Sequence, residues 1–450
     1  MPRFRNLVAS ALLIWAMSSA AHAAEPDRWI PTWAAPDVAR VDQPAQTLSP
    51  AAQAFPWVND VPDAVREAAP GQQLEVAGYS RLHFNNQTIR QIARVSTGGG
   101  RVRVVLSNTF GTAPLRIGAA QVALRDKGSS IVADTNRVLT FGGLAQPAVP
   151  PGAPLVSDPV DLTVPDFADV VVDLYLPGDT AAARSPVTVH PASWQTNYVS
   201  TQGNHAGAVT FPVAATTAYR RGDGLPSASS FFLSRVEIVA AQPTGVLVAF
   251  GDSITDGTQS GIDQNRRWPN LLAGRLADAG IRMSVVNGGI GGGRVLEDGV
   301  GPNGLARFGR DVLALPGVTH VTVMLGINDI GVGGARPSPS VAELIAGHRQ
   351  FIDRARARGF RVYGATLTPF EGAAYWTPEG EAKRQALNEW IRTSGAYDAV
   401  LDFAAATQDP ARPTRLRAEH DSGDHLHPSP AGYTAMANSI DLGLFRRTNP

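Results

Sequence analysis

The sequence predicts two folds in succession, an antiparallel β-rich part over 71–243 and a parallel α/β part over 244–450. The first prediction rests on short β-branched segments that recur between glycine, proline and asparagine. The second rests on a change after Pro243, where apolar strands begin to alternate with amphipathic stretches. Near-continuous apolar strands separated by helices indicate a three-layer unit, a parallel sheet covered on both faces.

Alternation of polar and apolar residues supports half-buried antiparallel strands in the β-rich part. The segment Arg101-Val102-Arg103-Val104 shows the pattern. The natural assignment is a β-sandwich or a jelly-roll-like fold. The expected strands cover 91–96, 101–107, 121–124, 138–141, 169–176, 195–200 and 231–238.

In the α/β part, prolines mark helix starts and glycines mark helix ends. Pro269, Pro378 and Pro430 stand at three expected starts, and Gly280 and Gly359 at two expected ends. The expected strands cover 246–250, 283–287, 321–325, 361–367 and 399–403. The expected helices cover 268–279, 302–315, 340–358, 378–394 and 430–442.

The first residues have the features of a secretory signal peptide over 1–23. Arg3 and Arg5 precede a short apolar stretch, and Ala21-His22-Ala23 has the small-x-small pattern of a cleavage site. Cleavage near Ala23 predicts an exported protein, periplasmic or extracellular. No later apolar run approaches the roughly 18 residues that a membrane helix needs, so no transmembrane segment is expected. Residues 24–70, rich in proline, alanine and aspartate, are expected to form an irregular lead-in.

The composition excludes several kinds of partner and chemistry. Basic and acidic residues number 39 each, so nothing favours nucleic acid or an anionic membrane surface, which attract a strongly basic protein. The chain has no cysteine, so it holds no disulfide, thiol nucleophile or thiolate metal ligand. Nothing in the sequence indicates an oligomeric state.

Ser253 is the first candidate for chemistry. It follows the strand expected over 246–250, in the segment Gly-Asp-Ser-Ile-Thr. A serine at the carboxyl end of a buried strand faces the crevice where open α/β folds bind ligands. It is therefore a candidate nucleophile, although an isolated Gly-Asp-Ser is also typical of a helix cap.

Two further loops follow the next two strands. The segment from Asn287 to Arg294 is rich in glycine, so its backbone N–H groups can approach a substrate oxygen closely. Asn328, in the segment Gly-Ile-Asn-Asp, offers a side-chain donor. Each loop taken alone is also typical of an ordinary turn. Nucleotide binding is disfavoured because the glycine loop lacks a Gly-Lys-Ser/Thr ending.

Asp424 and His427 lie in the segment Asp-His-Leu-His-Pro, before the last expected helix. A carboxylate three residues before a histidine can bind one ring nitrogen and leave the other free to take a proton from a serine. Ser253 is then the nucleophile, His427 the general base and acid, and Asp424 the orienting group. The backbone N–H of Ser253, a loop glycine N–H and the amide of Asn328 are the oxyanion donors.

These four blocks, in this order, resemble the SGNH hydrolase superfamily, also called GDSL esterases and lipases, over roughly 246–446. The resemblance implies a flavodoxin-like sheet, no metal or other cofactor, and a triad whose aspartate and histidine share one loop. It places the oxyanion glycine at Gly292, with Gly291 as an off-by-one alternative, and the oxyanion asparagine at Asn328. The β-rich part is similar to the N-terminal domain of one group of exported bacterial members.

The residues and the resemblance together predict a serine esterase that hydrolyses carboxylic esters through an acyl-serine intermediate. The resemblance favours short acyl or acetyl esters, and export favours a small-molecule or polysaccharide ester as substrate. Candidates for the pocket wall are Arg294, Trp268 and Trp376. For Trp268 the alternative is core packing, and for Trp376 the alternative is that the loop over 370–376 only covers the sheet.

A metal-dependent hydrolase is one alternative function, because a His-x-His pair with nearby carboxylates is typical of zinc sites. The crowded residues are His420, Asp421, Asp424, His425 and His427. Against this alternative, no other histidine stands in a companion motif. If His427 faces Ser253, we expect His425 to point away from it.

A second alternative is a carbohydrate-binding or surface protein whose hydrolase domain is vestigial. Exported β-sandwiches can bind glycans, and Trp194 and Tyr198 are candidates for a stacking platform. The occupied catalytic positions favour catalysis, since a binding module does not require them.

Overall fold

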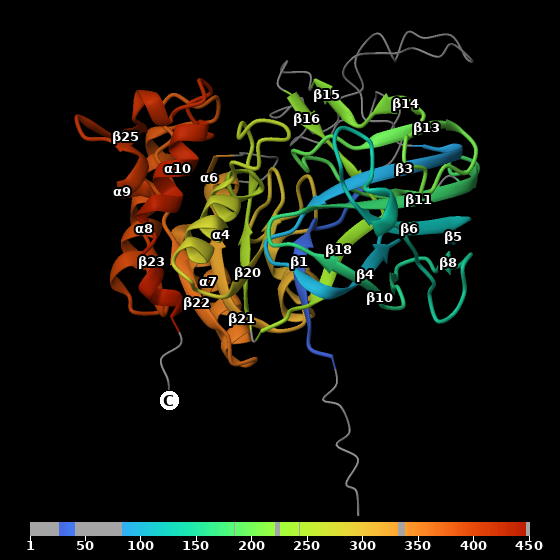
Figure 1. Cartoon of the computed structure of the whole chain (residues 1–450). Coiled ribbons are helices and arrows are strands. Elements are labelled where there is room, and N and C mark those ends of the chain that lie inside the picture. The colour runs from blue at the N-terminus through green and yellow to red at the C-terminus, as the bar shows by residue number, and fades with distance from the viewer. Residues whose placement is uncertain are drawn as a thin grey trace, which may run out of the picture.

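The computed structural model describes residues 27–40, 83–183, 185–220, 226–242, 244–331 and 338–446. In Figure 1 the blue-to-green β-rich part lies beside the yellow-to-red α/β part, and strands β1 (Trp29–Ala34) and β20 (Met283–Gly289) meet between them. The signal peptide expected over 1–23 lies outside the described residues. Within the described ranges, no helix is long and apolar enough to cross a membrane.

Two antiparallel sheets make up most of the β-rich part. One has the order β1-β18-β4-β10, with β9 beside β4, and the other has the order β14-β13-β3-β11-β6-β7. On β11, Val170, Val172 and Leu174 face the main core, whereas Val171 belongs to a smaller cluster, as a pleated strand requires. The strand expected over 138–141 is shortened to β7. The expected β-rich fold is confirmed.

The bounds of these strands are as follows. The first sheet contains β1 (Trp29–Ala34), β18 (Leu233–Val239), β4 (Gly99–Ser107), β10 (Val160–Val164) and β9 (Pro154–Val156). The second contains β14 (Val213–Thr216), β13 (Tyr198–Gln202), β3 (Asn85–Arg94), β11 (Asp169–Asp179), β6 (Ala119–Leu124) and β7 (Arg137–Val138). A third, small sheet contains β17 (Ser230–Phe231), β12 (Val187–His190) and β2 (Val38–Arg40).

Two expected strands differ from the structure for local reasons. The strand expected over 195–200 begins late, because Thr196 donates its backbone N–H and its hydroxyl to Asp263. The strand expected over 231–238 is interrupted at Phe232, whose φ of 58° lies in the left-handed region and separates β17 from β18.

The irregular lead-in expected over 24–70 is wrong where the structure describes it. Strand β1 pairs with β18, and strand β2 pairs with β12. Ile30 and Val38 are completely or almost completely buried, so the apolar residues between the prolines form the inward face of two strands. The register shifts just after Pro31, which has no N–H to give to the ladder. Residues 41–70 lie outside the described ranges.

The α/β part contains one parallel sheet with the order β20-β19-β21-β22-β23. This is the flavodoxin-like order, and its switch point lies between β19 and β21. All residues of β19 are buried, which confirms a sheet covered on both faces. The strands are β19 (Gly245–Gly251), β20 (Met283–Gly289), β21 (Val318–Met324), β22 (Arg361–Ala365) and β23 (Ala399–Leu401).

Helices cover the two faces of this sheet in two groups. One group contains α4, α9 and α10 and the other contains α5, α7 and α8, as right-handed crossovers require. The stretch expected over 302–315 is only partly α-helical, because Ala314 bonds to the carbonyl of Gly309, five residues back, in a π-helical turn. The helices are α3 (Ser253–Asp256), α4 (Trp268–Asp278), α5 (Gly304–Phe308), α6 (Ile327–Gly331), α7 (Val341–Arg356), α8 (Pro378–Thr393), α9 (Phe403–Thr407) and α10 (Pro430–Ser439).

One hydrophobic core runs through both parts of the chain. Strand β1 packs against β20, where the hydroxyl of Ser284 donates to the carbonyl of Pro31 at 2.6 Å and lies 3.0 Å from the hydroxyl of Ser96. Because packing is continuous across this seam, the division into domains at 243/244 stays a prediction.

Candidate active site

Ser253 lies at the carboxyl end of β19, at the switch point of the parallel sheet. Asp252 caps the short helix α3 by accepting the backbone N–H of Ile254 at 3.0 Å. A Cβ atom at Gly251 would lie 2.2 Å from the hydroxyl of Thr255, so the turn between strand and helix requires glycine. The turn and the cap together hold Ser253 at the edge of the sheet.

Ser253, His427 and Asp424 form a continuous hydrogen-bonded chain. Nε2 of His427 lies 2.8 Å from Oγ of Ser253, and Nδ1 lies 2.6 Å from Oδ2 of Asp424. Oδ1 of Asp424 accepts the backbone N–H groups of Leu426 and His427 at 2.9 and 2.8 Å. The hydroxyl of Ser422 also donates to Oδ1, at 3.2 Å. The carboxylate is thus fixed by four bonds, and it aims the second ring nitrogen at the serine. The structure therefore brings together the three residues that the sequence singled out.

Asp424 is held in its charged form. Burial alone would raise its pKa, but the charge of His427 and the bonds from the ring and backbone of that residue outweigh burial and hold the pKa well below the usual range. An ionised Asp424 keeps a proton on Nδ1 of the imidazole and leaves Nε2 able to accept one.

His425 makes a separate pair. Its Nδ1 lies 2.6 Å from Oδ2 of Asp421, and about half of the side chain is exposed. Its bond to Asp421 does not involve Ser253. Within the described ranges, no three histidine, aspartate or glutamate side chains come together as they would around a metal ion. The crowded segment therefore forms two separate carboxylate–imidazole pairs.

The glycine loop after β20 leaves one backbone donor unused. Gly291 donates its N–H to Oδ2 of Asp256 at 3.2 Å, and Gly293 donates to the carbonyl of Ile290 at 2.9 Å. The N–H of Gly292 has no acceptor among the residues that the structure describes. Its φ of 69° lies in the left-handed region, which favours glycine. Of the two glycines left open by the sequence, Gly292 is the one whose N–H is unused.

Asn328 lies on α6, directly beyond the adjacent strand β21. One proton of its amide group is donated to the carbonyl of Gly293 at 3.0 Å, and the other makes no hydrogen bond to a described residue. The amide oxygen accepts the hydroxyl of Tyr375 at 3.4 Å. The ring of Tyr375 lies over Gly331, where a Cβ atom would come within 1.9 Å of it. The oxygen and one N–H of the amide group are therefore hydrogen-bonded, and its second N–H has no acceptor among the described residues.

Asp329 fixes the two residues that follow the glycine loop. Its two carboxylate oxygens accept the backbone N–H groups of Val295 and Leu296, at 2.8 and 3.1 Å. Asp329 therefore joins its own turn to a neighbouring loop. Burial raises the pKa of Asp329 to about 6, although these bonds oppose the shift.

Asp252, next to the serine, is a second buried carboxyl group. Burial raises its pKa to about 7, against the opposing effects of the Ile254 amide and the charge of Arg307. Its Oδ2 atom has no hydrogen-bond partner in the described part of the chain. Arg307 itself donates to the carbonyls of Gly251 and Gly288 at 2.7 and 2.8 Å. It thereby ties together the ends of β19 and β20.

The three candidates for the pocket wall have different surroundings. The prediction that Trp268 lines the pocket is wrong, because this side chain is fully buried and packs against the ring of Phe403 at 5.2 Å between centroids. Trp376 is half-buried and packs against the main core. Arg294 ends the glycine loop and is 7% exposed. Its Nη1 lies 3.5 Å from Oε2 of Glu297. Only Arg294 and Trp376 remain candidates for substrate contact.

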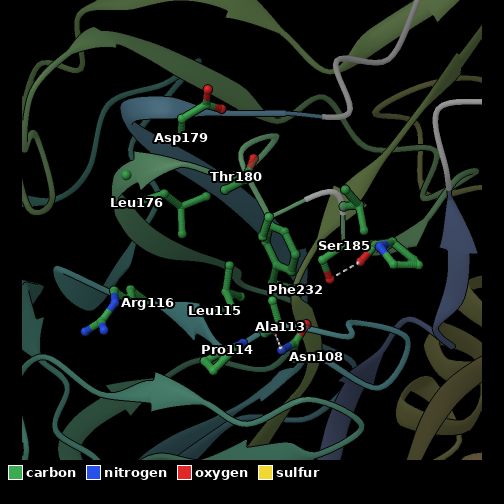
Figure 2. A pocket seen from close by; sticks show the side chains of 14 residues that line it. Asn108, Ala113, Pro114, Leu115, Arg116, Leu176, Asp179, Thr180, Ser185 and Phe232 are labelled. Carbon is green, nitrogen blue, oxygen red and sulfur yellow. Dashed lines mark hydrogen bonds between the residues drawn. The ribbon is translucent and has the colours of Figure 1, made fainter.

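The aromatic platform considered for the β-rich part is not formed. Trp194 is 2% exposed, and Tyr198 lies beside Arg125 in the sheet. The hollow of the β-rich part drawn in Figure 2 includes aliphatic side chains and Phe232, which is 3% exposed and offers no stacking face. None of the residues that line this hollow belongs to the α/β part.

A flavodoxin-like sheet that carries a serine, histidine and aspartate relay beside unused N–H donors defines the class of the protein, an ester hydrolase. Residues 249–435 match the GDSL-like lipase/acylhydrolase family, and this part of the chain belongs to that family. In the comparison with curated proteins, no sequence matches this chain.

Three solved structures illustrate the similarity. The lipase/acylhydrolase from Enterococcus faecalis is 21% identical, with 46% of this chain and 100% of that chain covered and a TM-score of 0.37. Est24, a carbohydrate acetylesterase from Sinorhizobium meliloti, is 17% identical over 44% of this chain and 96% of that chain, with a TM-score of 0.34. Axe2, an acetyl-xylooligosaccharide esterase from Geobacillus, is 23% identical over 44% and 94%, with a TM-score of 0.34.

Proposed function

We propose that the protein hydrolyses carboxylic esters through an acyl-enzyme on Ser253. The observation that carries this proposal is the relay from Asp424 through His427 to Ser253, with distances of 2.6 and 2.8 Å. Such a relay lets the imidazole take the serine proton as the oxygen attacks. No step of the reaction requires a further cofactor.

The chemistry follows from the geometry. Oγ of Ser253 attacks the ester carbonyl while its proton passes to Nε2 of His427, and a tetrahedral oxyanion forms. His427 then gives this proton to the departing alcohol, which leaves the acyl group on the serine. Water, deprotonated by His427, attacks the acyl group, and collapse of the second oxyanion releases the acid and restores the serine. Asp424 stays ionised throughout and stabilises the imidazolium.

Three donors are available to the oxyanion. They are the backbone N–H groups of Ser253 and Gly292 and the spare amide proton of Asn328, none of which has an acceptor in the described ranges. Donors that are already fixed lose little orientational freedom as charge develops, and this is why such sites stabilise the transition state. The bonds from Asn328 to Gly293 and Tyr375 support the same role.

We infer a short acyl group, such as acetyl, as the preferred substrate portion. The half-buried Tyr375 touches Asn328 and packs on Gly331, so a large side chain borders the proposed oxyanion donors. Arg294 and Trp376 are proposed to line the alcohol side. Export with cleavage near Ala23 is proposed from the sequence alone, and N-terminal sequencing of the secreted protein tests it.

The experiment that tests the function uses p-nitrophenyl esters of rising chain length, together with acetylated xylan. Wild type is expected to hydrolyse the shortest esters fastest. Ser253→Ala should lower kcat by about 10³- to 10⁶-fold while the protein still folds. Ser260→Ala is a matched control, because Ser260 is buried in the following loop and its hydroxyl has no described partner.

Two results would contradict the proposal. Near-normal activity of Ser253→Ala would exclude Ser253 as the nucleophile. Loss of activity with a chelator, combined with resistance to serine-directed phosphonates, would instead favour a metal-dependent hydrolase.

A further inference from the structure

A histidine of the β-rich part reaches the base of the proposed active site. His190 ends strand β12 and is 4% exposed. Its Nε2 lies 3.0 Å from Oδ1 of Asp256, and its Nδ1 lies 2.8 Å from the carbonyl of Pro36. Both ring nitrogens therefore face acceptors, and a doubly protonated ring satisfies both of them.

The groups around His190 favour the protonated, positively charged form of its ring. Burial alone would lower the pKa of His190, but the charge and bond of Asp256, with the bond to Pro36, raise it above the usual value. Asp256 is 1% exposed, and His190 is its only ion-pair partner in the described part of the chain, although the buried Arg267 is a second positive charge nearby. A buried carboxylate that loses such a partner becomes strongly unfavourable.

Asp256 connects this ion pair to the glycine loop. It is the last residue of α3, the helix that begins at Ser253. Its second oxygen accepts the N–H of Gly291 at 3.2 Å. The next residue is Gly292, whose own N–H is unused. One carboxylate thus joins the histidine of the β-rich part to the peptide just before the proposed oxyanion donor.

A second contact reaches the same loop from the same small sheet. Strand β2 pairs with β12, which carries His190. A Cβ atom at Gly301 would lie 2.6 Å from Cγ1 of Val38 and 3.5 Å from Cγ2 of Ile290, so β2 packs closely beside the glycine loop. The carbonyl of Asp37 also accepts a bond from Arg310 at 2.9 Å. The β2–β12 pair therefore supports the loop both by packing and by charge.

We propose that His190 is a positioning residue for the oxyanion site, acting through Asp256 to hold Gly291 and so aim the N–H of Gly292. The β-rich part thereby completes the site of the α/β part. This inference rests on the proposed role of Gly292, and it assigns the β-rich part a task in catalysis that is distinct from binding a polymer.

The test compares His190→Phe with a control that breaks an equivalent contact elsewhere. Ser284→Ala is that control, because Ser284 is buried and also makes two bonds across the seam, to Ser96 and Pro31, at the other end of β20. Both variants are measured with p-nitrophenyl acetate for kcat and KM, and their melting temperatures are recorded. Affinity for a boronic acid, which mimics the tetrahedral intermediate, is the third measurement.

His190→Phe is expected to lower kcat by about 10- to 100-fold with KM changed less than about threefold, and to weaken boronic acid binding in parallel. Ser284→Ala is expected to lower the melting temperature without changing kcat. His190→Gln, whose amide can still donate to Asp256, should retain more activity than His190→Phe. If His190→Phe does not fold, a lower kcat for His190→Ala, which has no donor, than for Ser284→Ala supports the proposal.

The inference is wrong if His190→Phe keeps a wild-type kcat, or if Ser284→Ala loses as much kcat as the His190 variants. An unchanged kcat for His190→Ala, where the phenylalanine variant is unfolded, also overturns it. The proposed function fails separately, through an active Ser253→Ala. An inactive Ser253→Ala together with a fully active His190→Phe refutes only the positioning role.

Discussion

Asp424 binds His427 twice, through the ring at 2.6 Å and through the backbone N–H at 2.8 Å. A few residues earlier in sequence, Asp421 makes the same 2.6 Å contact with the ring of His425. The two pairs differ in what lies beyond the imidazole. His427 goes on to Ser253, whereas about half of the His425 side chain faces solvent. The chain thus carries two similar carboxylate–imidazole pairs, and of these two only the Asp424–His427 pair contacts Ser253.

We predict that Asp424→Asn lowers kcat by about 10⁴-fold, because the amide favours the wrong tautomer of His427. Asp421→Asn breaks an equally short contact and should leave kcat within about twofold of wild type. The measurement is kcat on p-nitrophenyl acetate at neutral pH, with circular dichroism to show that both variants fold. Equal losses in the two variants would show that the segment matters for folding and not as a relay.

Asn328→Ala should lower kcat by about 10²- to 10³-fold, because one of three oxyanion donors is removed. Asn328→Asp keeps the size of the side chain but places a carboxylate beside the developing negative charge. It is expected to lose at least as much activity. Steady-state kinetics on one short ester decide the matter, and activity of the aspartate variant close to wild type would exclude a donor role.

Asp252→Asn should change how stability depends on pH. The folded state holds the proton of Asp252 up to a pKa of about 7, above the ordinary value of 3.8, because the carboxyl is buried. A raised folded-state pKa means that the folded protein binds more protons than the unfolded chain between these values, so wild-type stability falls as pH rises from about 4 to 7. Asparagine does not titrate and lacks this contribution.

The free energy of unfolding of Asp252→Asn, relative to wild type, is therefore expected to increase from pH 5 to pH 7 and to level off above it. Urea unfolding of both proteins at pH 5, 6, 7 and 8 provides the comparison. A difference that stays constant over this range would mean that the carboxyl is ionised throughout.

The variant Trp268→Ala tests whether Trp268 is a core residue or part of the pocket wall. Because Trp268 is fully buried against Phe403, its removal should cost about 3–5 kcal/mol of stability. The preference among p-nitrophenyl esters of different chain length should stay the same. A shift in that preference without a loss of stability would restore Trp268 as part of the pocket wall.

The fold and the proposed triad were accessible from the sequence for identifiable reasons. The parallel sheet follows from continuous apolar strands, and strand β19 is indeed buried throughout. Asp424 and His427 are close in sequence, so local geometry alone brings them within bonding distance. The order of the four blocks supplied Ser253 and Asn328.

Other features depend on contacts that no local pattern reveals. His190 meets Asp256 across the seam between the two parts, and nothing near either residue in sequence announces the other. A tryptophan can line a pocket or pack in a core. Only the packing of Trp268 against Phe403, seen in the structure, assigns it to the core. Strand β1 is hard to predict because Pro31 interrupts its pattern, although Ile30 and Trp33 are buried.

The place of strand β1 has a consequence for the order in which the molecule is made. Trp29 lies opposite Val239, so β1, the first strand among the described residues, pairs with a strand that is synthesised after the rest of the β-rich part. Its other neighbour, β20, arrives later still. Closing this seam joins very distant segments, which slows the last stage of folding and makes it a shared event for both parts. A hydrolase segment made without its leading strand would leave β20 bare along that seam.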